Sequence, residues 1–158
     1  MRIDSTVTSG KFRLDGGEWD VDNNVYVVGD DSNVYVVDPS HDLDAVAELV
    51  GDRHVEGILL THAHDDHVRM APELAMALEA PLLLNPADRE VWQLTHGDLP
   101  WDDDVADGDV FSVGGTDIEA LHTPGHMGSH LAFRLGEAVF CGDLVMGWST
   151  TLISPGSI

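Results

Sequence analysis

The sequence predicts a mixed α/β protein built from layers of sheet and helix. Three observations support this: two β-branched runs early in the chain, a middle part in which apolar runs alternate with helical stripes, and a later succession of short strand-like runs. Alternating strands and helices favour a parallel sheet covered by helices, whereas consecutive strands favour antiparallel pairing. At 158 residues the chain is long enough for one domain with a substantial core, so we expect a single domain over residues 1–158.

The first elements are a predicted hairpin and a helix. Val25–Val28 and Val34–Val37 are β-branched and aromatic runs separated by turn-forming residues, which predicts two paired strands. Apolar residues at helical spacing then predict a helix over residues 43–50. Either Ser40 or Asp42 can serve as its N-cap, because both carry a side-chain oxygen just before the helix.

The middle of the chain continues the alternation. Val55–Leu60 is a continuous apolar run, which is typical of a strand buried on both faces. A helix is predicted over residues 70–78, with Pro72 near its start, and a strand over Pro81–Leu84. Asn85, followed by a proline, is expected to cap a third helix.

The last part is predicted to be strands. Trp101–Asp109 is an acid-rich stretch that we interpret as a loop. After it, four strands separated by glycine-bearing turns are predicted, at Val110–Val113, Asp117–Leu121, Leu131–Leu135 and Ala138–Phe140. Gly147–Ile158 shows no helical stripe that could cover the sheet these strands would form.

The charge of the chain excludes several classes of partner. There are 29 acidic and 7 basic residues, which gives a net charge of −22 and a pI of about 4.3. So few cations cannot neutralise a row of phosphates, and an anionic membrane would repel the chain, so we expect no nucleic-acid partner and no membrane partner. No stretch reaches the roughly 18 apolar residues of a membrane span.

The composition also suggests a cellular setting. Aspartate outnumbers glutamate 21 to 8, and Lys11 is the only lysine. A carboxylate-rich surface tolerates its self-repulsion when salt screens it, so one hypothesis is a protein from a salt-accumulating, halophilic organism; an ordinary acidic protein is the alternative. Cys141 is the only cysteine, which predicts a reducing, cytoplasmic location.

The densest group of metal-ligand side chains directly follows the predicted buried strand at Val55–Leu60. In the run 62–67, His62, His64 and His67 accompany two carboxylates. Residues two apart in an extended segment share a face, so His62 and His64 can hold one ion together. Asp66 and His67, where the chain turns into a helix, can reach a second ion. Imidazole and carboxylate ligands suit Zn²⁺, Fe²⁺ or Mn²⁺.

Two later residues can complete such a site. His126 lies in a tight Pro-Gly turn after a predicted strand, and Asp143 follows Gly142 at the end of another. Ligands in open α/β sheets bind beyond the carboxyl ends of strands, where the histidine run also lies. His126 would add a third imidazole for the first ion, and Asp143 a carboxylate able to bridge both ions.

These motifs carry a family resemblance. Thr61–His67, Thr123–His126 and Gly142–Asp143, in this order and spacing, resemble motifs of the metallo-β-lactamase superfamily, and residues 23–26 and 37–39 resemble its opening strands. Within the superfamily the chain is most similar to glyoxalase II-like hydrolases. The resemblance implies an αββα sandwich and the following ligands: His62, His64 and His126 for the first metal, Asp66 and His67 for the second, and Asp143 as the bridge.

The chain departs from the family pattern at its C-terminal end. Two-metal members of the superfamily place a final histidine on a later loop, but no histidine follows His130 here. His130 is too close to His126 to take that place. We therefore expect an incomplete second metal site and an incomplete second half of the sandwich, truncated after Gly142–Asp143. A homo-oligomer that covers the exposed sheet, or a site that works with one metal, would also explain the departure.

The resemblance implies a metal-dependent hydrolase. A metal-bound hydroxide would attack an acyl carbon, with Asp66 orienting it, and a small-molecule thioester or similar acyl compound is the expected substrate. Arg69 or screening by salt would have to compensate for repulsion of an anionic substrate. One alternative is an oxidoreductase like the persulfide dioxygenases, with one iron held by His62, His126 and Asp143. Another is an inactive, metal-binding remnant.

Overall fold

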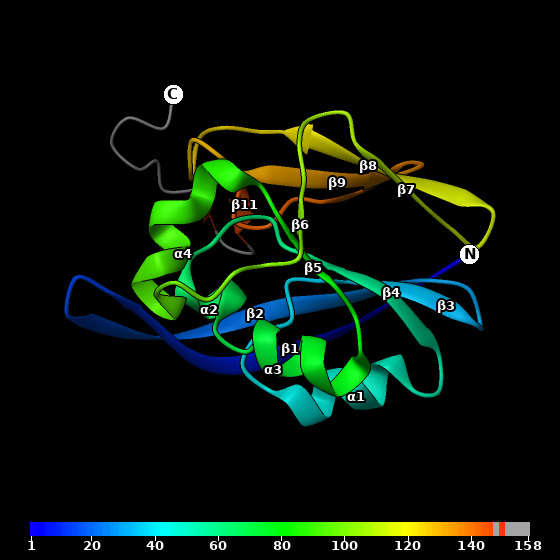
Figure 1. Cartoon of the computed structure of the whole chain (residues 1–158), viewed down its shortest axis with the longest axis horizontal. Coiled ribbons are helices and arrows are strands. Elements are labelled where there is room, and N and C mark those ends of the chain that lie inside the picture. Colours follow the sequence, from blue (N-terminus) through cyan, green and yellow to red (C-terminus); the bar gives the residue numbers. More distant parts are fainter. Residues whose placement is uncertain (147–148, 151–158) are drawn as a thin grey trace.

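Two β-sheets face each other across the centre of the molecule, and helices cover the outer face of the larger one (Figure 1). The computed structural model describes residues 1–146 and 149–150. One apolar core lies between the helices and the larger sheet, and a second lies between the two sheets. The predicted layered α/β architecture is therefore confirmed.

The larger sheet has the strand order β1-β2-β3-β4-β5-β6. Its strands are β1 (Arg2–Leu14), β2 (Gly17–Gly29), β3 (Asn33–Val37), β4 (His54–Leu59), β5 (Leu82–Leu84) and β6 (Asp103–Asp104). β1, β2 and β3 pair antiparallel, as the predicted hairpin requires, and β3 to β6 pair parallel. The carboxyl ends of the parallel strands thus meet at one edge, where the histidine run begins.

The helices connect the parallel strands. They are α1 (Leu43–Val50), α2 (Asp65–Val68), α3 (Ala71–Leu78), the short 3₁₀ helix η1 (Pro86–Asp88) and α4 (Arg89–His96). Asp42, rather than Ser40, caps α1, since its carboxylate accepts the Ala45 N–H at 3.0 Å. Asn85 caps η1 through the Ala87 N–H at 3.1 Å. None of the helices among the described residues is long and apolar enough to cross a bilayer.

The second sheet has the order β10-β9-β8-β7, with every neighbouring pair antiparallel. Its strands are β7 (Val110–Val113), β8 (Thr116–His122), β9 (Leu131–Leu135) and β10 (Ala138–Phe140), which confirms the four predictions. A small separate pair, β11 (Val145–Met146) and β12 (Ser149–Thr150), follows. From His96 onward the described residues form strands, turns and loops, so the second half of the sandwich lacks helices in this part of the chain.

Two features were not expected from the sequence. β1 and the first half of β2 form a long hairpin, which carries few apolar runs because most of its side chains are exposed. The predicted loop at residues 101–109 contains the short edge strand β6. The predicted uncovered tail at Gly147–Ile158 lies, apart from residues 149–150, outside the described residues.

Candidate metal centre

All six predicted ligand side chains meet at the carboxyl-end edge of the larger sheet. They come from three segments: the loop and helix after β4, the loop between β8 and β9, and the turn after β10. Five of the six residues are buried, with at most 8% of their surface exposed, and the Asp143 side chain is 25% exposed. The residues brought together are His62, His64, Asp66, His67, His126 and Asp143.

The first group of ligand atoms combines three imidazoles and one carboxylate. His64 Nδ1 lies 3.1 Å from His62 Nε2 and 3.1 Å from His126 Nε2. Asp143 Oδ2 lies 3.3 Å from His126 Nε2 and 3.7 Å from His62 Nε2. One ligand atom from each of the four residues lies within 4.8 Å of the others, a set that could hold a metal ion.

The second group is built from Asp66, His67 and Asp143. His67 Nε2 lies 3.1 Å from Asp143 Oδ1 and 3.5 Å from Asp66 Oδ2. Asp143 therefore presents Oδ2 to the first group and Oδ1 to the second. A carboxylate shared in this way can bridge two ions.

The donor set fits a divalent metal. Between two facing imidazole nitrogens only one can carry the proton of a hydrogen bond, so three converging nitrogens cannot all satisfy one another. Asp66 Oδ1 is buried and has no hydrogen-bond partner in the structure. Neutral imidazoles with carboxylate oxygens are ligands for zinc, iron or manganese. A cation between these atoms would satisfy lone pairs that the protein leaves unmatched.

Asp38, which ends β3, holds two of the histidines in the ligating tautomer. Its Oδ2 accepts the Thr61 hydroxyl at 2.6 Å, so that hydroxyl is left to accept the His62 Nδ1–H at 2.9 Å. Oδ2 also accepts the His67 Nδ1–H at 2.9 Å. Both rings are thereby left with the Nε2 lone pair facing the ligand groups, the usual outer-shell arrangement of metal-binding histidines.

Asn23, on β2, supports the second group. Its Nδ2 donates to Asp66 Oδ2 at 3.0 Å and lies 3.3 Å from His67 Nε2, while its Oδ1 lies 2.9 Å from His41 Nε2. Asn23 and Asp38 were not identified as site residues from the sequence. A signal existed for Asp38, since it ends the strand beside β4, the strand that leads into the histidine run.

Burial and neighbouring charges separate the histidines electrostatically. Burial lowers the pKa of His62 well below its ordinary value and, with help from His126, lowers the pKa of His64 to about 4. Burial also opposes protonation of His67, but the carboxylates of Asp66, Asp143 and Asp38 outweigh it and raise the pKa of His67. His62 and His64 are therefore neutral at pH 7, the state in which an imidazole binds a metal.

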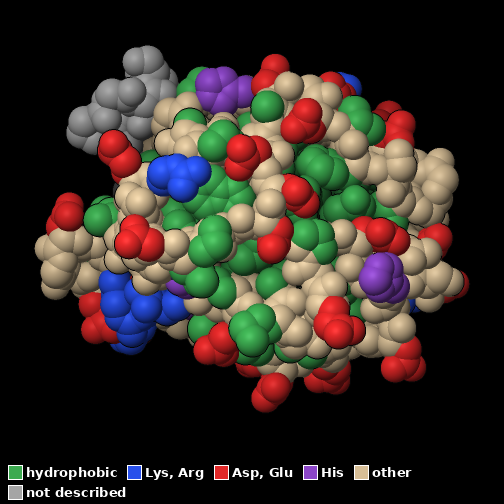
Figure 2. Space-filling model, viewed as in Figure 1, with side chains coloured by type: hydrophobic (Ala, Val, Ile, Leu, Met, Phe, Trp, Pro, Cys, Tyr) green, Lys and Arg blue, Asp and Glu red, His purple; other side chains and the backbone are tan. Residues whose placement is uncertain are grey.

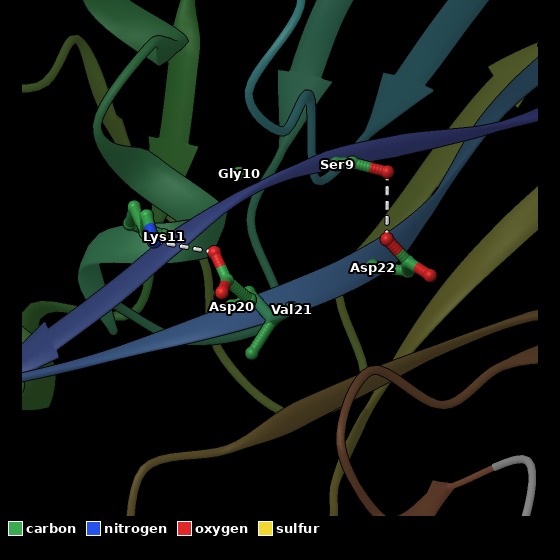
Figure 3. Close-up of a pocket in the computed structure, with 6 residues that line it drawn as sticks. All are labelled: Ser9, Gly10, Lys11, Asp20, Val21 and Asp22. Carbon is green, nitrogen blue, oxygen red and sulfur yellow. Dashed lines mark hydrogen bonds and ion pairs between the residues drawn. The ribbon is translucent and has the colours of Figure 1, made fainter.

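A cavity of about 600 Å³ opens beside the second group and is lined by Asp66, His67 and Asp143. A second hollow of about 400 Å³ follows the β1–β2 hairpin and shares part of this wall. Figure 3 shows how its polar residues pair: the Ser9 hydroxyl donates to Asp22 at 2.6 Å, and Lys11 forms an ion pair with Asp20. The only lysine of the chain is thus already held by a carboxylate.

The other histidines lie outside both ligand groups. His130 is fully buried, its ring centroid is 5.0 Å from that of His62, and its Nδ1 lies 3.0 Å from Thr123 Oγ1. His96 Nε2 donates to the Val68 carbonyl at 2.8 Å, and its ring packs on Trp92. No histidine beyond His67 joins the second group among the described residues.

The comparisons with known proteins assign the family. The sequence profile of the metallo-β-lactamase superfamily matches residues 19–157. The chain therefore belongs to the metallo-β-lactamase superfamily.

Relatives with printed functions are hydrolases. The chain is 34% identical over 155 residues to an atrochrysone carboxyl ACP thioesterase of Aspergillus chevalieri, covering 91% of this chain and 45% of that protein. It is 31% identical over 127 residues to a protein of Bacillus velezensis named "probable polyketide biosynthesis zinc-dependent hydrolase BaeB", covering 78% and 55%. The chain thus spans about half the length of these curated relatives.

A solved structure is similar as well. The crystal structure of TTHA1623 in a di-iron-bound form superposes with a TM-score of 0.67 at 29% identity, covering 85% of this chain and 73% of that one. This similarity agrees with the layered fold described above.

Proposed function

We propose that this protein is a metal-dependent hydrolase that cleaves a small-molecule thioester or a similar acyl compound. The observation that carries the proposal is the pair of ligand groups sharing Asp143 beside a cavity. In this proposal His62, His64 and His126 hold the first ion and Asp66 and His67 hold the second. The names of the thioesterase and zinc-dependent hydrolase relatives support the same reaction class.

The chemistry divides between the metal and the chain. A bound divalent ion lowers the pKa of water from 15.7 to about 7 and polarises an acyl oxygen. The chain's part is to hold the ligands and to place a proton acceptor. Asp66 is proposed for the second task, because its Oδ1 is buried without a partner whereas Asn23 holds Oδ2 at 3.0 Å.

The charge of the cavity favours a neutral acyl group. Among its described lining residues there is no lysine or arginine, whereas Asp20 and Asp22 line its outer wall. Arg69, which could have attracted an anion, instead forms an ion pair with Asp65 at 2.9 Å and does not line the cavity. Figure 2 shows acidic side chains spread over one face of the molecule, with few basic ones among them. A carboxylate-bearing substrate would be repelled at low salt.

Thioester hydrolysis tests the proposal directly. We expect the metal-loaded protein to hydrolyse a neutral short-chain acyl thioester, to lose this activity on dialysis against a chelator, and to regain it with Zn²⁺. We also expect kcat/KM to fall for a matched thioester ending in a carboxylate, and the gap to narrow with added salt. No metal-dependent hydrolysis of either thioester would contradict the proposed function.

Iron chemistry is the second candidate. The first ligand group contains His62, His126 and Asp143, the two histidines and one carboxylate of a mononuclear iron site, and the similar TTHA1623 was solved in a di-iron-bound form. Elemental analysis after aerobic purification separates the readings. Two zinc ions per chain support the hydrolase, one iron per chain supports the oxidoreductase, and no metal supports an inactive remnant.

Adaptation to salt is part of the proposed setting. The net charge of −22 implies strong self-repulsion, which salt screens. We expect the melting temperature to rise between low and molar NaCl, and to rise in KCl to a similar extent. Thermal melts followed by circular dichroism measure this, and an unchanged melting temperature would contradict the halophilic interpretation.

A cytoplasmic location and a homo-oligomer that covers the second sheet stay predictions. The outer face of that sheet carries Val110 and Val139, each at least half exposed, in one cross-strand row with the Glu119–Arg134 ion pair. An apolar pair flanking a charge pair is compatible with contact between copies of the chain.

A further inference from the structure

Asp88 is a buried carboxylate that belongs to neither ligand group. It is the last residue of η1, and only 1% of its surface is exposed. Oδ2 accepts the Ala63 N–H at 2.7 Å, and Oδ1 accepts the Ser129 hydroxyl. Both oxygens are therefore used in contacts with other loops.

These two contacts join the loops that carry the three imidazoles of the first group. Ala63 lies between His62 and His64, and Ser129 lies three residues after His126. Asn85 adds a second tie from η1, because its Nδ2 donates to the Ser129 carbonyl at 3.2 Å. The histidine loop after β4 and the His126 loop are thus attached to the same short helix.

The attachment matters because the imidazoles come from segments far apart in sequence. His64 Nδ1 and His126 Nε2 lie 3.1 Å apart although 62 residues separate them. A shift of about 1 Å between the loops would move one ligand out of reach, since metal–nitrogen distances tolerate only about 0.2 Å. Losing Asp88 would also leave the buried Ala63 N–H without its acceptor.

We propose that Asp88 is a positioning residue of the metal centre, a clamp that fixes the histidine loop against the His126 loop so that His62, His64 and His126 converge on one ion. The inference rests on the proposed metal-binding role of these histidines. Asp88 contacts neither the ion nor the substrate and acts through Ala63 and Ser129.

Metal affinity is the measurement that tests the clamp. Zn²⁺ affinity is determined by competition with a chromophoric chelator, and the Co²⁺-loaded protein is compared by visible absorption. We expect Asp88→Ala to weaken the tighter Zn²⁺ site by about 10–100-fold, the usual cost of removing an outer-shell partner. Asp88→Asn keeps an acceptor for Ala63 N–H and a partner for Ser129, so it should remain within about threefold of the parent, below that range.

Two further variants separate positioning from stability. Val46→Ala removes buried volume from α1, away from both loops, and serves as a destabilised control. Ser129→Ala removes one arm of the clamp, and combining it with Asp88→Ala should add little, because both act through one contact. If Asp88→Ala does not fold, as judged by circular dichroism, Ser129→Ala decides the question by the same chelator competition.

The outcomes distinguish the two proposals. If the unchanged protein binds neither Zn²⁺ nor Co²⁺, the proposed metal centre itself is wrong. If it binds them and Asp88→Ala binds equally well, or no worse than Val46→Ala, the clamp is wrong while the metal centre stands. Unchanged affinity in a folded Ser129→Ala variant, with Asp88→Ala unfolded, overturns the clamp as well.

Discussion

Replacing Asp143 by alanine is expected to empty both metal sites and to lower kcat for thioester hydrolysis by at least about 100-fold, the scale of losing one preorganised electrostatic group. The reason is its position, with Oδ2 facing the first ligand group and Oδ1 facing the second. Metal content by elemental analysis and steady-state kinetics measure the two effects separately.

Single-group variants refine this result. His64→Ala should weaken the first ion and spare the second, whereas Asp66→Ala should do the reverse, because each residue belongs to one group only. Asp22→Ala is the matched control, since Asp22 lines the same cavity but is bonded to Ser9 and joins neither group. Full metal content in Asp143→Ala would show that this carboxylate does not bridge two ions.

Gly142→Ala is expected to be the most damaging single methyl addition near the site. Gly142 has φ +52°, and an added Cβ would lie 2.6 Å from His130 Nε2 and 2.7 Å from Thr61 Oγ1. Left-handed backbone costs a non-glycine residue about 1–2 kcal/mol, and overpacking a filled site adds about 1–3 kcal/mol. The neighbouring Asp143 would shift as well, so metal affinity should fall along with the free energy of unfolding.

Gly136→Ala isolates the backbone part of this effect. Gly136 has φ +59° in the turn between β9 and β10, but nothing lies within 4 Å of its added Cβ. Its variant should therefore lose only the backbone cost, with unchanged metal affinity. Urea unfolding of the metal-free proteins gives the comparison. Equal free-energy losses in the two variants would show that the surroundings of Gly142 yield without cost.

Local pattern was enough to predict much of the fold. The four strands of the second sheet and α1 lie where short β-branched runs and helical spacing placed them, because each element buries its own apolar side chains. The β1–β2 hairpin escaped prediction for the opposite reason. Its stability comes from a continuous ladder between two largely exposed strands, and backbone pairing leaves little trace in side-chain hydrophobicity.

The candidate site divides in the same way. A run such as 62–67 concentrates ligand types within one strand end, so its sequence alone announces metal chemistry, and the family motifs add His126 and Asp143. Asp38, Asn23 and Asp88 carry no comparable signal. Isolated aspartates and asparagines are common at strand ends and turns, and only the folded chain shows which of them accept or donate at the histidines.

The sequence by itself therefore determined the layered fold class, the family resemblance and the residues able to bind metal, because periodicity and short motifs are local properties. The length and charge that first suggested an acidic, salt-tolerant domain left open what the site would attract. Only the tertiary structure decided that Lys11 and Arg69 are held by carboxylates, that Asp143 faces two ligand groups, and that Asp88 ties their loops together. Those relations depend on distances between segments that lie far apart along the chain.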